Sequence, residues 1–218
     1  PLLQAVLDEN LLDEYRKILK AFYGVLKSAD RYLRFVFLTG VTKFAQVSVF
    51  SDLNQLNDIS MDRAYNALCG ITQDELIKTF GPEIQRLSEN EELTLEETIF
   101  RLAKKYDGYH FTWPSPDVFN PFSLLNAFED GKLNSYWFGS GTPTYLIEML
   151  RKFHVLPSEV GHSMQAMAAS FDAPTERSMT TIVPLLYQSG YITIKNYDKL
   201  TQLYTLDIPN GEIRVGLM

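Results

Sequence analysis

Apolar side chains recur every three or four residues between Leu11 and Lys27, with charged side chains at most positions between them. This spacing predicts an amphipathic helix with one apolar face. The pattern changes at Phe35–Leu38, where four consecutive residues are apolar. Such a run is typical of a strand that is buried on both faces of a parallel sheet. We expect the strand to end at Thr39, at the sheet edge where open α/β proteins bind ligands.

The middle of the chain carries several signals for the start of a helix. Thr72 with Glu75, and Thr94 with Glu97, have the spacing of a capping box, in which each side chain pairs with the other residue's free backbone N–H. Proline follows Asn120, as it does in a first helical turn behind an N-cap. The helices expected from these signals run roughly over 73–79, 82–87, 95–106, from 121 onward, and up to 150.

The C-terminal part combines a helix with two short strands. A helix over about 180–188 is expected to end at Gly190, followed by strands over 191–194 and 203–208 and a turn over 196–199. A helix followed by a hairpin is typical of a winged helix. Residues 158–178 show little periodicity, so they are either a connector or one more helix.

Composition and charge narrow the possible partners. The net charge of −7 among 218 residues disfavours broad nucleic-acid binding, which needs a basic surface. No apolar run approaches the ~20 residues of a membrane span, and one cysteine, Cys69, makes no internal disulfide. Three scattered histidines offer no zinc spacing. We therefore expect a cytoplasmic protein without a membrane or metal partner and without broad nucleic-acid binding, although one local basic face is not excluded.

A succession of motifs resembles the AAA-ATPase-like family that is found beside a PD-(D/E)xK nuclease-like domain in many bacterial proteins. The motifs follow one another along nearly the whole chain, and their order is more specific than any one of them. They read FVFLTGVTKF from Phe35, VSVFSDLNQLNDIS from Val47, AYNALCGIT from Ala64, YDGYHF from Tyr106, NPFSLLNAF from Asn120 and YWFGSGTPTYL from Tyr136.

The resemblance implies a mixed α/β, mostly helical chain in three parts. These are the C-terminal part of a P-loop ATPase core (1–58), a helical lid-like region (59–139) and a winged-helix-like region (140–218). The family's Walker A and Walker B segments are expected to precede this chain, because the sequence contains no G-x-x-x-x-G-K-[ST]. ATP and magnesium are then expected as cofactors only together with that missing N-terminal segment.

The resemblance also implies candidate nucleotide-sensing residues at the end of the apolar run, namely Thr39, Thr42 and Lys43. A hydroxyl at Thr39 can sense a γ-phosphate, or it can cap the turn that follows. Lys43 can contact phosphate, or it can be a solvated loop lysine.

Lid-like or base-contacting candidates come from two later motifs and are Tyr106, Asp107, Gly108, Tyr109, Ser140 and Pro143. The aromatic rings of the first motif can stack on a base or pack in the core. Ser140 to Pro143 can start a helix with or without an anion at its N-terminus. No role follows from chemistry for Asp107, and His110 is expected to be a partly buried imidazole.

Two functions of different classes follow. In the first, the chain belongs to an ATP-binding regulatory switch that gates a C-terminal nuclease-like domain and has no hydrolytic centre of its own. In the second, it is a non-catalytic scaffold that contacts a protein or DNA through the winged helix. The apolar run at Phe35–Leu38 also predicts self-association wherever it lacks a sheet to join.

Overall fold

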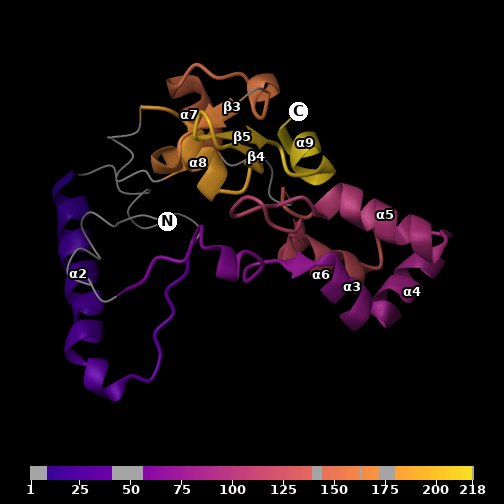
Figure 1. The fold of residues 1–218 in the computed structure, drawn as a ribbon, viewed down its shortest axis with the longest axis horizontal. Helices are drawn as coiled ribbons and strands as arrows, with labels where there is room; N and C mark the ends of the chain where they lie inside the picture. Colours follow the sequence, from indigo (N-terminus) through magenta and orange to yellow (C-terminus); the bar gives the residue numbers. More distant parts are fainter. Residues whose placement is uncertain (1–8, 41–55, 139–143, 163, 172–179, 218) are drawn as a thin grey trace. The chain divides into compact units, whose positions relative to one another are not determined.

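A computed structural model describes residues 9–40, 56–138, 144–162, 164–171 and 180–217, which form a mixed α/β structure with more helix than strand (Figure 1). The chain divides into two compact units. The smaller comprises Pro1–Asp58 and Asp172–Thr180, and the larger comprises Ile59–Phe171 and Thr181–Met218.

The predicted amphipathic helix of the smaller unit is confirmed as α2 (Glu9–Ser28). Its C-terminus is closed locally: the Ser28 hydroxyl donates to the Val25 carbonyl over 2.9 Å, and the Ala29 N–H donates to the same oxygen. A 3-10 turn, Asp30–Tyr32, follows. The helix therefore ends where its apolar periodicity ends.

The strand predicted at Phe35–Leu38 is wrong for the described structure, because residues 33–40 have no regular secondary structure. Phe35 is 81% exposed, and its ring stacks on that of Phe37 with centroids 6.4 Å apart. A strand needs a neighbouring backbone to satisfy its N–H and C=O groups. No strand in the described ranges pairs with this segment. The apolar run thus lacks the sheet that its burial requires.

Four helices of the larger unit begin close to where the sequence predicts. The Thr72–Glu75 capping box is present in full, and Thr94 accepts a hydrogen bond from the Glu97 N–H. The Asn120 side chain caps its helix through two backbone N–H groups. The helices are α3 (Gln73–Thr79), α4 (Gly81–Asn90), α5 (Leu95–Tyr106) and α6 (Pro121–Asp130).

These helices share one apolar core. Its fully buried side chains come from each helix and include Leu76, Leu87, Leu102 and Leu124. A short antiparallel pair of strands, β1 (Ile71–Thr72) and β2 (Val118–Phe119), lies at its edge, and a 3-10 turn, Arg63–Tyr65, precedes them. The core fixes where α5 ends and α6 begins, which places the loop between them.

The rest of the larger unit surrounds a three-stranded antiparallel sheet in the order β3-β5-β4. Figure 1 shows this sheet in orange and yellow, with α8 beside it. The elements are α7 (Thr144–Lys152), the 3-10 turns Pro157–Glu159 and Ala168–Phe171, β3 (Met164–Ala166), α8 (Val183–Gln188), β4 (Thr193–Asp198), β5 (Leu203–Asp207) and α9 (Gly211–Leu217).

Four predictions for this region need correction. β3 occupies residues predicted as a connector or helix, because it adds to the free edge of β5. β4 begins later than expected, since the N–H groups of Tyr191 and Ile192 both donate to the Leu186 carbonyl and close α8. The turn is also later, because the Asp198 carboxylate accepts from the Leu200 and Thr201 N–H groups. Helix α8 itself starts three residues after the predicted Thr180, and α9 was not predicted.

Candidate functional site

The YDGYHF motif contains the last residue of α5, Tyr106, and the first part of the loop that leads to β2. Many of the polar contacts described below involve this loop. Helix α5 ends at Tyr106, and the Asp107 N–H donates to the Ala103 carbonyl. Tyr109 then pairs with Val118 through two backbone hydrogen bonds of 3.3 and 3.1 Å. The chain from Gly108 to Asp117 therefore leaves the helix, turns and returns beside its own start.

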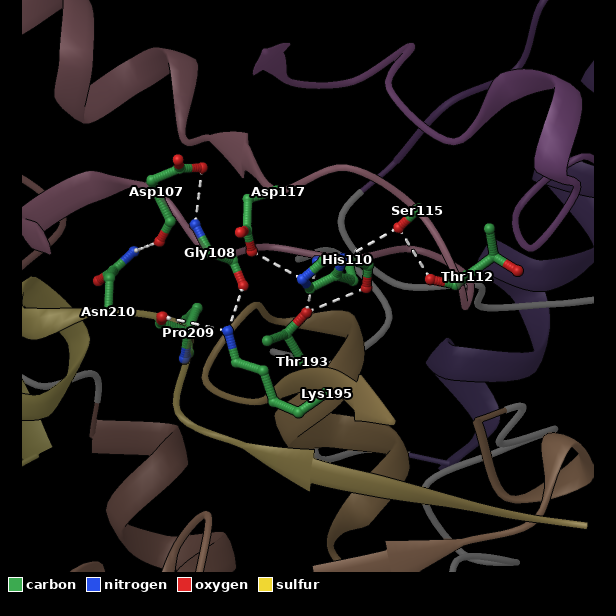
Figure 2. A network of polar contacts seen from close by, with 10 residues as sticks. All are labelled: Asp107, Gly108, His110, Thr112, Ser115, Asp117, Thr193, Lys195, Pro209 and Asn210. Carbon is green, nitrogen blue, oxygen red and sulfur yellow. Dashed lines mark hydrogen bonds and ion pairs between the residues drawn. The ribbon is translucent and has the colours of Figure 1, made fainter. Parts of the chain in front are cut away.

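Two side chains of β4 hold this loop through its backbone (Figure 2). The Thr193 hydroxyl accepts from the His110 N–H over 2.7 Å and donates to the His110 carbonyl over 3.0 Å. The Lys195 ammonium donates to the Gly108 carbonyl over 2.7 Å and lies 3.5 Å from the Pro209 carbonyl. Backbone atoms 83 to 87 residues away along the chain are thus bound to one strand.

Asn210 adds a third attachment and couples the loop to α9. Its side-chain amide donates to the Asp107 carbonyl over 3.1 Å, while its oxygen accepts from the Ile213 N–H and caps α9. Asn210 is 8% exposed, so both bonds form away from water. The end of α5 and the start of α9 are therefore joined by one amide.

The His110 imidazole makes polar contacts with other side chains of the same loop. Its Nδ1 lies 2.9 Å from the Ser115 hydroxyl oxygen. The Ser115 hydroxyl donates to the Thr112 carbonyl, also over 2.9 Å. The imidazole Nε2 lies 2.7 Å from a carboxylate oxygen of Asp117. The Trp113 ring meets the imidazole edge to face at 5.0 Å. Both ring nitrogens thus point to groups of the same loop, as Figure 2 shows.

The charges in this loop are shaped by burial. Burial raises the pKa of the Asp107 carboxyl to about 6, against the hydrogen bond that it accepts from the Gly108 N–H. Burial lowers the pKa of the Lys195 ammonium, although Asp117, Asp207 and Asp107 oppose this. Burial also lowers the pKa of His110, against the attraction of Asp117. The loop and β4 therefore hold the Asp107 and Asp117 carboxyls, the Lys195 ammonium and the His110 imidazole close enough to influence one another's pKa values.

The two tyrosines of the motif lie inside the unit. Tyr106 is fully buried, and its hydroxyl donates to the Asn134 carbonyl over 2.6 Å. The Tyr109 hydroxyl donates to the Gly190 carbonyl over 3.2 Å, and Tyr109 is 8% exposed. Both rings are packed in the interior and hydrogen-bonded at their tips.

The other candidate residues lie in the smaller unit or outside the described residues. Thr39 is exposed in the smaller unit, in the segment without regular structure. Thr42, Lys43, Ser140 and Pro143 lie outside the described residues. Of the candidates, the structure therefore describes Tyr106, Asp107, Gly108 and Tyr109 together, and these are consecutive in the sequence.

Sequence reasoning missed the partners that hold the loop, which are Ser115, Asp117, Thr193, Lys195 and Asn210. Lys195 lies between the strand predicted over 191–194 and the turn predicted over 196–199. The β4–β5 register shifts between Ile194 and Asn196, so Lys195 is the extra residue of a bulge. A bulge redirects a side chain, and hydrophobic alternation contains no sign of it. A signal that could have found Asn210 is its position before a glycine and a glutamate, which suits an N-cap.

In the described part of the chain, no three histidine, cysteine, aspartate or glutamate side chains gather as metal ligands would. Among the same residues, no helix combines the length and the apolar character of a membrane span.

Replacing Asp107 with asparagine is expected to change how stability depends on pH. The folded protein holds the Asp107 proton up to about pH 6, whereas an unfolded chain releases it near ~3.9. The native state therefore loses stability from this group as pH rises between those values. Asparagine keeps an oxygen for the Gly108 N–H and does not ionise. Relative to wild type, Asp107→Asn should gain about 1–2 kcal/mol between pH 4 and 7, allowing for solvent screening. Urea unfolding across that range measures it, and a difference that is constant with pH would contradict it.

Comparison with known proteins adds two findings. The model of a family described as Predicted AAA-ATPase, AAA-ATPase-like, matches residues 1–50. The chain is also similar to an uncharacterized protein in the vnfD 5' region of Azotobacter chroococcum mcd 1, with 34% identity over 224 residues. That alignment covers the whole of this chain and 40% of the relative. No solved structure matches. Residues 1–50 are therefore similar to the AAA-ATPase-like family, and the chain as a whole is similar to the uncharacterized Azotobacter protein.

Proposed function

We propose that this chain is part of an ATP-binding regulatory switch and relays the state of a bound nucleotide to a nuclease-like domain of the same protein. The AAA-ATPase-like match at residues 1–50 supports the first half of this proposal. The chain spans 40% of the length of the relative described above, which is compatible with further domains in the whole protein. The finer assignments, a P-loop core, a lid and a winged helix, are part of the same proposal.

One observation supports the proposed relay of the nucleotide state through this chain. The loop after α5 is bound by backbone-directed hydrogen bonds to Thr193 and Lys195 on β4 and to Asn210 at the start of α9. A lid-like helical region and a winged-helix-like region that share such contacts would move together. A displacement of the helices at a nucleotide would then be carried to the sheet and α9 without an additional hinge.

The chain by itself would not hydrolyse ATP. Its sequence has no G-x-x-x-x-G-K-[ST], so it supplies neither the backbone N–H groups nor the lysine that surround a triphosphate in P-loop proteins. Binding of ATP and magnesium is proposed only for the whole protein, with the Walker segments contributed by residues outside this chain.

The winged-helix-like part is proposed to contact protein rather than DNA. Four residues of α8, Val183 to Leu186, are buried, so this helix faces the core. A groove-reading helix would have to expose its side chains to base edges. The tip of the β4–β5 hairpin exposes Leu200 almost completely and carries one lysine, Lys199. Such a tip is poorly suited to neutralise phosphates.

A non-catalytic scaffold is the second candidate, and one observation favours it. The titratable side chains of the loop and of β4 beside it engage one another or the backbone: Asp107 with Gly108, His110 with Asp117, and Lys195 with Gly108. A loop whose polar groups are already paired gains little by meeting a nucleotide. In this case the same contacts would serve only to hold the larger unit together.

Adding Mg–ATP to the 218-residue chain and to the full-length protein distinguishes the switch from the scaffold. The 218-residue chain should show neither micromolar ATP affinity by calorimetry nor steady phosphate release. In the full-length protein, a switch predicts that Mg–ATP changes hydrogen–deuterium exchange across residues 107–117 and in α9. ATP binding to the full-length protein without any change there would favour the scaffold. Micromolar ATP affinity of the 218-residue chain would contradict the assignment of phosphate binding to residues outside it.

A further inference from the structure

The Ser115, His110 and Asp117 side chains form a hydrogen-bonded row of hydroxyl, imidazole and carboxylate. Ser115 Oγ lies 2.9 Å from His110 Nδ1, and His110 Nε2 lies 2.7 Å from a carboxylate oxygen of Asp117. The same order of groups occurs in serine hydrolases. Here, however, the Ser115 hydroxyl donates to the Thr112 carbonyl and the His110 side chain is 6% exposed. The row is thus engaged in closing its own loop.

Three contacts in the row each need a proton. These are Nε2 to Asp117, Nδ1 to Ser115, and Ser115 to the Thr112 carbonyl. A carboxylate and a carbonyl oxygen only accept, so neither supplies one. The imidazolium has two N–H groups and the serine has one O–H, which makes three protons for three contacts. A neutral imidazole leaves two protons, and one of the three contacts then has no hydrogen.

We propose that His110 is a proton-operated staple: when doubly protonated it completes the hydrogen bonding of the loop from Gly108 to Asp117, and when neutral it leaves one bond open. In the neutral form with the proton on Nε2, the Ser115 hydroxyl either turns to Nδ1 and releases the Thr112 carbonyl, or stays and leaves Nδ1 alone. With the proton on Nδ1, the contact between Nε2 and Asp117 has no hydrogen. The loop becomes easier to open in each of these arrangements.

The charged groups around His110 decide which form is held. On its own loop, Asp117 favours the imidazolium, while Lys195 on β4 opposes it, and Asp107 interacts electrostatically with both of these groups. Arg63, from the 3-10 turn before β1, donates to the Trp113 carbonyl over 3.2 Å. Burial lowers the pKa of His110, and Asp117 works against that shift. A change near Lys195 or Asp117, such as a charged partner binding there, would therefore shift the staple between its forms.

The staple has a consequence beyond its own loop. The His110 backbone is bound on both sides by Thr193 of β4, so a looser loop also weakens the attachment between α5 and the sheet. This inference concerns the chain itself and does not depend on the proposed nucleotide switch.

Nuclear magnetic resonance of the 218-residue chain tests the proposal. Nitrogen-15 shifts of the His110 ring should show both nitrogens protonated at low pH and one after titration. As the pH rises through this titration, amide exchange of residues 111–117, corrected for intrinsic rates, should become about fivefold faster. This factor corresponds to the loss of one hydrogen bond of about 1 kcal/mol. His110→Gln should remove this pH dependence, and His162→Gln, at an exposed histidine, should preserve it.

Two variants test the row itself. Asp117→Asn removes the carboxylate charge, and Ser115→Ala removes the oxygen that accepts from Nδ1. Both should lower the pH at which the ring titrates, Asp117→Asn by more. A ring that keeps one protonated nitrogen from pH 5 to 8 with unchanged exchange would overturn the proposal. So would labelling of Ser115 by a fluorophosphonate, because that hydroxyl would then be a nucleophile and not a closing hydrogen bond.

Discussion

Replacing Gly108 with alanine is expected to destabilise the larger unit by about 2–4 kcal/mol. Gly108 has a φ of +95°, in the region that side-chain-bearing residues rarely adopt. A Cβ there would collide with the Pro209 carbonyl oxygen and would lie 3.2 Å from the Lys195 ammonium. The loop would have to move off the strand, and the bond between Lys195 and the Gly108 carbonyl would be lost with it.

Gly81→Ala is the matched control for this change. Gly81 is the first residue of α4, and a Cβ at this position meets nothing within 4 Å. Its substitution should leave stability unchanged or raise it slightly, because alanine restricts the unfolded chain. Urea titrations of both variants give the comparison. Equal stability of Gly108→Ala and wild type would show that the loop does not approach Pro209 as closely as the structure has it.

Truncating Glu212 to alanine is expected to cost about 2–4 kcal/mol. Glu212 is 1% exposed, and one of its carboxylate oxygens accepts from the Tyr136 N–H over 2.5 Å and from the Trp137 N–H over 3.0 Å. Alanine would leave both backbone donors without an acceptor in the interior. The segment before α7 would then lose its attachment to α9.

Glu212→Gln separates hydrogen bonding from charge. Glutamine keeps one oxygen for the two N–H groups, so it should lose less than half as much stability as the alanine variant. The second carboxylate oxygen of Glu212 has no hydrogen-bond partner in the described structure, and an amide there would replace an unpaired acceptor with an unpaired donor. If both variants were equally unstable, the buried charge and not the two hydrogen bonds would be the main contribution. Thermal unfolding monitored by circular dichroism measures both.

Local signals along the chain predicted the helices well, for a physical reason. The hydroxyl of Thr72 and the carboxylate of Glu75 reach backbone N–H groups three residues away, so the capping box forms before any tertiary contact is needed. The same holds for Asn120, whose side chain bonds the N–H groups of Phe122 and Ser123. The apolar periodicity of α2 likewise depends only on the helix's own geometry.

The strands and the candidate site depended on partners far away in the sequence. Phe35–Leu38 has the apolar run of a buried strand, yet pairs with no strand of the described residues, because a strand is made by its neighbours. β3 has a weak pattern and exists through its pairing with β5. The motif around Gly108 was identified from its sequence, but its polar partners were not.

By itself, the sequence determined where most helices begin, which side of each helix is apolar, the Gly190 cap and the resemblance to AAA-ATPase-like proteins. These properties need only interactions within a few residues or the order of short motifs. The tertiary structure decided that Lys195 points from a bulge to the Gly108 carbonyl, that Asn210 joins Asp107 to α9, and that Tyr106 and Tyr109 are interior. The contacts of Lys195 and Asn210 join residues 87 and 103 positions apart, and the Tyr106 and Tyr109 hydroxyls bond carbonyls 28 and 81 positions away. They form only once the helices and the sheet have packed, because no local pattern specifies which distant carbonyl a side chain will meet.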